Sequence, residues 1–209
     1  MSDQLRADSL CYQVVSRLIA YPDAELVESL PLLATAVGSL PTAYRQALEP
    51  LVAHLRSTPL VEAQAAYVAT FDLRRRCCLY LTYFAHGDTR KRGMALLDFK
   101  HAYRQAGVEL DDSELPDHLE VVLEFAGTVD PGAGRQLLLD HRAGLELLGL
   151  SLRDAHSPYA GAVAAVSATL PALRGDEREA IRRLVAQGPP GEDVGLEPFA
   201  PPDYMGARA

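Results

Sequence analysis

The sequence of 209 residues lacks the cysteine and histidine patterns of disulfide-rich and metal-binding proteins. It has three cysteines, Cys11, Cys77 and Cys78, without any C-x-x-C spacing. Adjacent cysteines have poor geometry for a mutual disulfide and make poor paired metal ligands. The six histidines are not grouped at metal-ligand spacing. The sequence therefore predicts reduced thiols, as in the cytoplasm, no metal site and no bound cofactor.

Long apolar runs are also absent. No stretch approaches the ~20 apolar residues that a membrane-spanning helix needs. The first ten residues, MSDQLRADSL, are polar and do not resemble a secretory leader. We therefore expect a soluble, cytoplasmic protein that is not an integral membrane protein.

The common catalytic motifs are missing too. The sequence contains no G-x-S-x-G, P-loop, G-x-G-x-x-G or H-E-x-x-H motif, and so indicates a protein that is not an enzyme. One alternative is a helical enzyme that uses His118 and Asp117 as an acid/base pair. Neighbouring residues on a helix point ~100° apart, which disfavours that pair. A second alternative is a regulator that binds nucleic acid through the basic runs Arg74–Arg76 and Arg90–Arg92, which the net charge of −8 disfavours.

What is present is helical periodicity almost throughout. Ala and Leu are abundant, β-branched residues are few, and no alternating strand pattern is sustained. We expect one all-α domain of about eight to ten helices over residues 1–187. Residues 188–209 are rich in Pro and Gly and are expected to form a flexible tail.

Pro, Gly and Asp place several of the helix ends. Asp23 is expected to cap one helix and Gly107 to end another, while Pro31 is expected to kink or break the chain. Pro116 is expected to open a helix with Asp117 in its first turn, where a carboxylate suits the helix dipole. The expected helical segments span about 10–19, 23–37, from 41, 59–71, 89–106, from 116, 136–150, 159–170 and 176–186.

Charge is distributed unevenly along the chain. Residues 72–104 hold eight Lys or Arg and three acids, a net of +5, whereas residues 108–130 hold eight acids and no Lys or Arg. The two blocks either pair with each other or form a polarised binding surface. Three cations at the start of a helix oppose its dipole, which marks a candidate functional site. The candidate charged surface for a partner comprises Arg74, Arg75, Arg76, Arg90, Lys91 and Arg92.

Aromatic residues cluster beside the basic block. Tyr67, Phe71, Tyr80 and Tyr83 are each individually suited to the core, but together they could line a groove for an apolar helix. A helical reading also places Asp117, Glu120 and Glu124 on one acidic face. Such a face could recognise a basic peptide, although most acidic helix faces are simply solvated.

Several ordered motifs resemble one known family. They are FDLRRR at 71–76, LYLTY at 79–83, GDTR at 87–90, RGMAL at 92–96, Lys100, Tyr103, ELPDHL at 114–119 and VLEF at 122–125. Together they resemble the NarJ type of nitrate reductase assembly chaperone, most densely over residues 67–125.

The resemblance implies an all-helical, non-enzymatic cytoplasmic chaperone, related to the TorD and DmsD kind. Such a protein binds the N-terminal segment of the catalytic (alpha) subunit of respiratory nitrate reductase. It supports molybdenum-cofactor insertion, controls the timing of membrane docking and works alongside cofactor-delivery proteins. The E-x-x-D-H string of that wider family maps to Glu114, Asp117 and His118, around Pro116, and is implicated in peptide binding. The resemblance also implies that substituting Asp117 or His118 weakens binding more than folding.

Overall fold

The computed structural model describes residues 3–87, 89–111, 113–175, 178–179 and 181–183, and this part is all-α, as expected. No strand occurs within it. The elements are α1 (Asp3–Leu18), α2 (Ala24–Ser39), α3 (Thr42–Ser57), α4 (Leu60–Tyr67), the π-helix η1 (Val68–Asp72), the 3-10 helix η2 (Arg75–Cys77), α5 (Tyr83–His86), α6 (Arg90–Gln105), α7 (Leu119–Thr128), α8 (Pro131–Asp140), α9 (Arg142–Asp154) and α10 (Ala160–Thr169).

Some helix ends follow the sequence signals closely. The Asp23 carboxylate accepts a hydrogen bond from the Leu26 N–H at 2.7 Å, which caps α2. Gly107 adopts a φ of 80° just after α6, a conformation that glycine adopts without steric cost. Pro31 lies inside α2 without ending it.

Other boundaries differ from the expectation. The segment expected to be one helix over 59–71 is α4 followed by the π-helix η1, and the segment 136–150 is divided at His141 into α8 and α9. The helix expected to open at Pro116 begins later, at Leu119. Residues 175, 178–179 and 181–183 are helical, while the rest of the expected 176–186 helix and the tail 188–209 lie outside the described residues.

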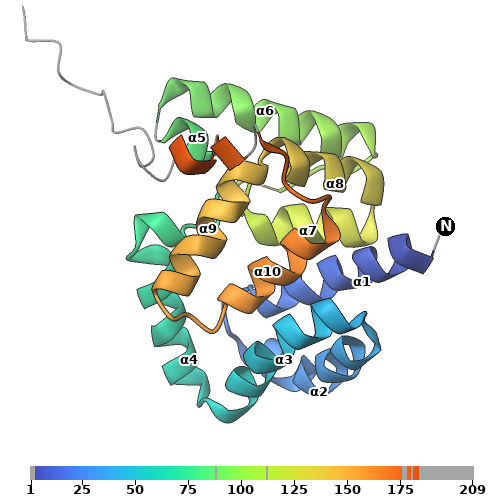
Figure 1. Cartoon of the computed structure of the whole chain (residues 1–209), viewed down its shortest axis with the longest axis vertical. Helices are drawn as coiled ribbons and strands as arrows, with labels where there is room; N and C mark the ends of the chain where they lie inside the picture. The colour runs from blue at the N-terminus through green and yellow to red at the C-terminus, as the bar shows by residue number, and fades with distance from the viewer. Residues whose placement is uncertain (1–2, 88, 112, 176–177, 180, 184–209) are drawn as a thin grey trace, which may run out of the picture.

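The core is formed by helices packed around α1 and α10. Figure 1 shows α2, α3 and α4 toward one end of the molecule and α6 and α8 toward the other, with α1, α7 and α10 between them. Helix α1 packs on α7, α2 and α10, and α3 packs between α2 and α10. In the described part of the chain, no helix combines the length and apolarity required to cross a membrane. Cys11 and Cys77 are buried free thiols.

Helices α3 and α10 approach so closely that only glycine fits at one contact. A Cβ at Gly161 would overlap the backbone carbonyl oxygen of Ala47. This contact fixes how deeply α10 sits against α3, because a backbone atom cannot swing aside as a side chain can.

An antiparallel β-bridge between Tyr80 and His118 joins two distant segments. The Leu81 N–H donates to the Asp117 carbonyl at 3.1 Å, and the Leu119 N–H donates to the Leu79 carbonyl at 2.8 Å. This β-bridge brings the aromatic and basic segment against the acidic segment, and it positions the candidate site.

Candidate functional site

A buried carboxylate lies beside the β-bridge. Asp117 is fully buried, and its Oδ2 accepts hydrogen bonds from the Thr82 N–H at 3.1 Å and from the Thr82 hydroxyl at 2.6 Å. Thr82 directly precedes α5. Asp117 therefore ties the start of α5 to the segment before α7.

This position corrects two expectations from the sequence. Asp117 lies in a turn before α7, so it is not in the first helical turn. It also shares no helix face with Glu120 and Glu124, because its carboxylate points into the protein toward Thr82. The local pattern predicts that the Asp117 carboxylate stabilises the beginning of its own helix. Instead, this carboxylate accepts a hydrogen bond from Thr82, which lies 35 positions away in the chain.

The basic and acidic blocks meet at Arg92. Its Nε donates to the Thr82 hydroxyl at 3.2 Å, and its Nη2 lies 3.8 Å from Asp117 Oδ2. The guanidinium carbon lies 5.2 Å from the centroid of the Tyr80 ring, within cation–π range. Arg92 therefore connects α6 to both segments that the β-bridge joins, through Thr82 and Tyr80 on one side and Asp117 on the other.

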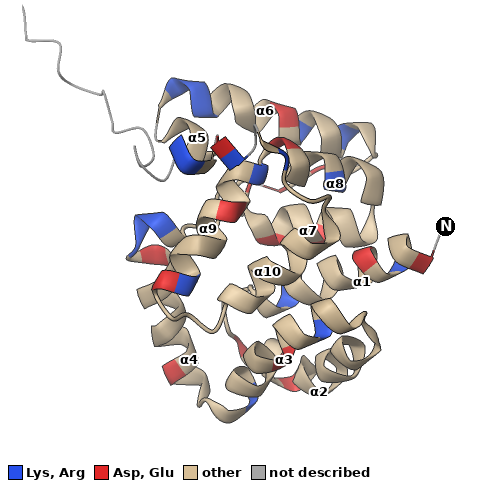
Figure 2. Ribbon diagram, in the orientation of Figure 1, with Lys and Arg blue, Asp and Glu red and all other residues tan. Residues whose placement is uncertain are grey.

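The other five cations of the two basic runs, Arg74, Arg75, Arg76, Arg90 and Lys91, are exposed. Figure 2 shows basic segments at 74–76 and at the beginning of α6, both at the left edge of the view. Their exposure leaves them accessible to a charged partner, as the sequence analysis proposed.

Two further polar contacts order the acidic segment. The Tyr80 hydroxyl donates to Glu114 Oε1 at 3.1 Å, and the Tyr103 hydroxyl donates to the Pro116 carbonyl at 2.6 Å. Burial, reinforced by Glu114, raises the pKa of Tyr80 to about 12. Tyr80 is therefore a neutral hydrogen-bond donor at physiological pH.

An open groove of about 580 Å³ runs between the loop after α6 and helix α7. We call it the acidic groove. Its apolar lining comes from Val108, Leu110, Val121, Phe125 and Val129, with Tyr103. Its carboxylates are Glu109, Asp111, Glu114, Glu120 and Glu124, and no Lys or Arg is among its described lining residues.

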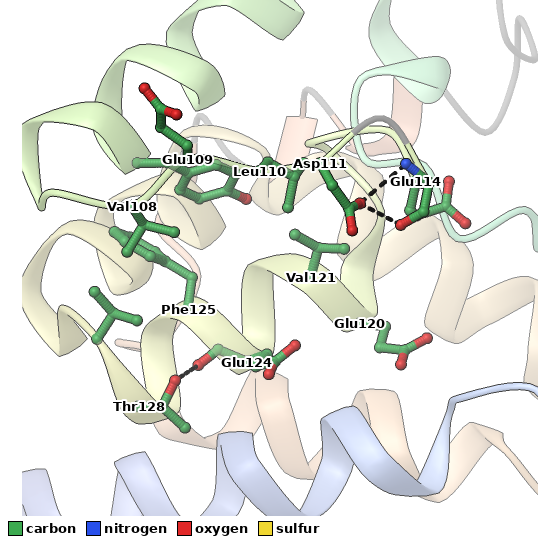
Figure 3. A pocket seen from close by; sticks show the side chains of 13 residues that line it. Val108, Glu109, Leu110, Asp111, Glu114, Glu120, Val121, Glu124, Phe125 and Thr128 are labelled. Atoms are coloured by element: carbon green, nitrogen blue, oxygen red, sulfur yellow. Dashed lines mark hydrogen bonds between the residues drawn. The ribbon is translucent and has the colours of Figure 1, made fainter.

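The orientation of these side chains is visible in Figure 3. Val108 and Leu110 point from the loop toward Val121 and Phe125 of α7, whereas Glu109 points away. Asp111 is held by the N–H and the hydroxyl of Ser113. Hydrogen bonds to the Asp111 carboxylate lower its pKa, so that it stays charged. The groove thus has an apolar floor and acidic edges.

A second, smaller cavity of about 250 Å³ shares Glu114 and Glu120 with the acidic groove. We call it the tyrosine cavity. It is lined by Tyr21, Tyr67, Phe71, Asp72, Leu79, Tyr80, Glu114, His118 and Glu120. The π-helix η1 carries Phe71 and Asp72 into this lining. π-Helical turns occur frequently at functional sites.

The structure divides the residues expected to bind peptide. Tyr67, Phe71, Tyr80, Glu114, His118 and Glu120 line the tyrosine cavity, and Glu124 lines the acidic groove. Tyr83, Pro116 and Asp117 are buried outside both linings. Tyr83 packs edge-on against Phe84, with ring centroids 6.1 Å apart. These three residues support the site rather than line it.

The sequence analysis missed the loop side of the acidic groove and one ring of the tyrosine cavity. The missed residues include Val108, Leu110 and Val121 in the groove and Tyr21 in the cavity. In the sequence, the signal for the groove is the segment 108–130, which has eight acids and no Lys or Arg. Val108 and Leu110 alternate with acidic residues at the start of that segment. No sequence pattern predicts that Tyr21 lines the cavity, because it lies 46 positions before Tyr67 and the two rings come together only in the folded protein.

His118 and Asp117 do not form a pair. The Asp117 carboxylate binds Thr82, whereas His118 Nδ1 lies 4.0 Å from Glu120 Oε2. The described residues also contain no group of three or more potential metal ligands. The geometry therefore gives no support to the alternative in which His118 and Asp117 act as an acid/base pair.

Comparison with solved structures defines the class of fold. A crystal structure described as that of "a putative redox enzyme maturation protein" from Archaeoglobus fulgidus superposes with a TM-score of 0.56 at 24% sequence identity. The match covers 76% of this chain and 91% of that chain. This protein therefore shares the all-helical fold of that Archaeoglobus fulgidus protein.

Sequence comparison then defines the family. The family model described as nitrate reductase delta subunit matches residues 38–165, and the chain belongs to this family. The matched range contains the acidic groove and, apart from Tyr21, the whole lining of the tyrosine cavity. The NarJ-type resemblance seen in the sequence is confirmed.

Three relatives illustrate the range of the family. The nitrate reductase molybdenum cofactor assembly chaperone NarJ of Escherichia coli K12 is 35% identical over 150 residues, covering 70% of this chain and 64% of NarJ. NarJ of Bacillus subtilis is 32% identical over 157 residues, covering 72% and 83%. The nitrate reductase-like protein NarX of Mycobacterium tuberculosis H37Rv is 45% identical over 159 residues, covering 76% and 24%. The chain thus spans about a quarter of the length of NarX. The NarJ relatives are named as assembly chaperones rather than catalysts, in agreement with the expectation of a non-enzymatic protein.

Proposed function

We propose that this protein is an assembly chaperone for a respiratory nitrate reductase. It binds the N-terminal segment of the catalytic (alpha) subunit, supports insertion of the molybdenum cofactor and delays membrane docking until insertion is complete. It acts in the cytoplasm, alongside cofactor-delivery proteins. Family membership and the assembly role named for the NarJ relatives support this proposal.

The acidic groove is the structural observation that carries the proposal. An amphipathic helix could lay its apolar face on Val121 and Phe125 and direct its cations toward Glu120 and Glu124. Helix-in-groove recognition uses this arrangement of an apolar floor with charged edges. A basic amphipathic segment is therefore the class of ligand that the groove fits.

The apolar floor should supply most of the affinity. Burying one large apolar side chain contributes on the order of 1.5–3 kcal/mol. An exposed charge pair contributes ~0.2–1 kcal/mol and is screened by salt. The acidic edges should therefore mainly orient the peptide and speed its association.

The exposed cations at 74–76 and 90–91 form a second candidate surface. None of these five residues lines the acidic groove or the tyrosine cavity. We assign them to a further, negatively charged protein partner of the same assembly pathway.

Isothermal titration with the N-terminal peptide of the catalytic subunit from the same organism tests the proposed function. We expect binding with a negative heat-capacity change and a modest salt dependence. Val121→Glu places a charge on the groove floor and should weaken binding at least about tenfold. Val61→Glu is the matched control, because Val61 is 75% exposed on α4 and lies outside the groove lining.

Equal affinities for the wild type and Val121→Glu would place the peptide elsewhere. A peptide that binds no better than its scrambled version would refute the proposed function. An affinity that collapses by orders of magnitude in salt would identify the charged surfaces, rather than the groove floor, as the main binding site.

A further inference from the structure

The tyrosine cavity is surrounded by aromatic rings. Tyr67 lies 5.4 Å from Tyr21 and 4.7 Å from Phe71 between ring centroids. Tyr80 and His118 form a second group, with their centroids 5.2 Å apart. Tyr21 is 49% exposed, so the cavity can be reached from solvent. Arg92 already lies within cation–π range of the Tyr80 ring, so Tyr21, Tyr67 and Phe71 are the rings whose quadrupoles would attract a further cation in this cavity.

The polar lining of the cavity carries one sign of charge. Asp72, Glu114 and Glu120 contribute carboxylates, and its described lining residues include no Lys or Arg. Burial raises the pKa of Glu120, and repulsion from Glu124 and Glu114 adds to the effect against the opposing influence of Arg17. A guest cation would relieve this repulsion.

One side chain of the lining has unused hydrogen-bonding capacity. His118 is only 7% exposed, and its Nδ1 has no hydrogen-bond partner among the described residues. Buried polar atoms of this kind are usually satisfied in native proteins, by protein groups or by bound molecules. Burial lowers the pKa of His118, so the ring is neutral near pH 7 and does not repel a cation.

We propose that the tyrosine cavity binds the guanidinium group of one arginine of the client peptide. The proposal rests on the proposed function, in which the rest of the peptide lies in the acidic groove. Glu114 and Glu120 line both spaces, so a peptide in the groove can insert a neighbouring side chain into the cavity. The volume of about 250 Å³ far exceeds the ~10–15 Å³ that a single water requires.

The chemistry of the lining favours arginine over lysine. A guanidinium group is planar, stacks on aromatic faces and offers five donors in a rigid arrangement. It can therefore contact the rings and the carboxylates at the same time. A lysine ammonium is a compact, strongly hydrated charge and loses more of its hydration on entering an aromatic cavity.

Nuclear magnetic resonance titration with two small probes tests the cavity directly. N-acetyl-arginine amide is the probe, and N-acetyl-citrulline amide, which has nearly the same shape but no charge, is its control. We expect the arginine probe to shift the ring signals of His118 and Tyr80 saturably, with a millimolar dissociation constant suited to so small a ligand. Citrulline should shift them at least about threefold less at the same concentration. Equal shifts from both probes, or no saturable shift from either, would overturn the proposal.

Matched variants locate the binding. Asp72→Asn and Tyr21→Leu alter the cavity alone and should weaken the arginine probe about threefold to tenfold. Glu109→Gln alters a carboxylate of the acidic groove that is absent from the cavity lining, and it should leave probe binding unchanged. If Glu109→Gln weakens the probe as much as Asp72→Asn does, general charge attraction explains the binding and the cavity proposal is wrong.

Client peptides with each arginine in turn replaced by citrulline separate this proposal from the proposed function. We expect one position to lose affinity with the wild type and to lose much less with Asp72→Asn. If the peptide binds equally well whichever arginine is replaced, the cavity proposal is wrong and the proposed function stands. If the peptide fails to bind while the arginine probe still binds saturably, the proposed function is wrong and the cavity remains a guanidinium site.

Discussion

Asp117 helps to shape the candidate site without lining it. Its carboxylate is fully buried, binds the start of α5 through Thr82 and faces Arg92 from α6. It lines neither the acidic groove nor the tyrosine cavity. Its contribution should therefore appear in stability first and in binding only through the shape of the site.

Asp117→Ala should lower the free energy of unfolding by about 3–5 kcal/mol, because it removes two hydrogen bonds and the charge partner of Arg92 from a buried position. Chemical denaturation monitored by circular dichroism measures this loss.

Asp117→Asn is the companion variant, because its amide oxygen can still accept from Thr82 and the loss should be clearly smaller. Peptide affinity of the folded Asn variant should stay within a few fold of the wild type. A large loss of affinity with unchanged stability would restore the direct peptide-binding role that the sequence resemblance implied.

The contrast between Asp23 and Asp117 shows what local sequence can predict. Asp23 binds an N–H three residues ahead, so its capping role follows from its own neighbourhood. Asp117 binds a residue 35 positions away, and no local pattern encodes that distance. Charge, aromatic character and family resemblance predict six of the residues that line the tyrosine cavity, but the sequence does not show that the β-bridge brings two segments of that lining together.

At the scale of the helices, periodicity predicted where most elements lie but not where two of them change geometry. The Leu-rich pattern continues across His141, although the chain turns there between α8 and α9. The apolar pattern of 59–71 likewise passes through the change from α4 to η1. Both changes depend on packing partners from elsewhere in the chain, which a one-dimensional pattern does not contain.

Gly161→Ala should destabilise the protein by about 1–3 kcal/mol, because the new methyl group would meet the Ala47 carbonyl oxygen and push α10 away from α3. Thermal unfolding measures the effect as a lower melting temperature.

Gly93→Ala is the matched control within α6. Gly93 is exposed, and a Cβ there would meet no atom within 4 Å. Alanine should stabilise that helix by about 0.5–1 kcal/mol. If both substitutions raise the melting temperature, backbone entropy rather than the α3–α10 contact governs them.

For the molecule as a whole, buried histidines link stability to pH. Burial lowers the pKa of His118 and of His141 below the usual 6.5, with nearby carboxylates partly opposing the shift. The unfolded chain therefore binds more protons than the folded protein as the pH falls past that value, and stability decreases. Denaturation midpoints should therefore drop as the pH falls below about 6.5, the pKa of a histidine in the unfolded chain.

His141→Gln should reduce this pH dependence without affecting the binding surfaces, because His141 stacks on Phe99 and lines neither the groove nor the cavity. His101→Gln is the control, since His101 is exposed on α6. An unchanged pH dependence in His141→Gln would show that other groups control the loss of stability.

The β-bridge makes the chain between Leu81 and Asp117 a closed loop, and two backbone hydrogen bonds hold the ends of that loop together. The amide protons of Leu81 and Leu119 therefore report how often the β-bridge opens, since each exchanges with deuterium only when its hydrogen bond breaks. Helix α6 is part of this loop in the sequence, and its own amides report the opening of the helix itself. Comparing the exchange rates of the β-bridge amides and of the α6 amides would show whether α6 opens while the β-bridge stays intact or whether the two open together.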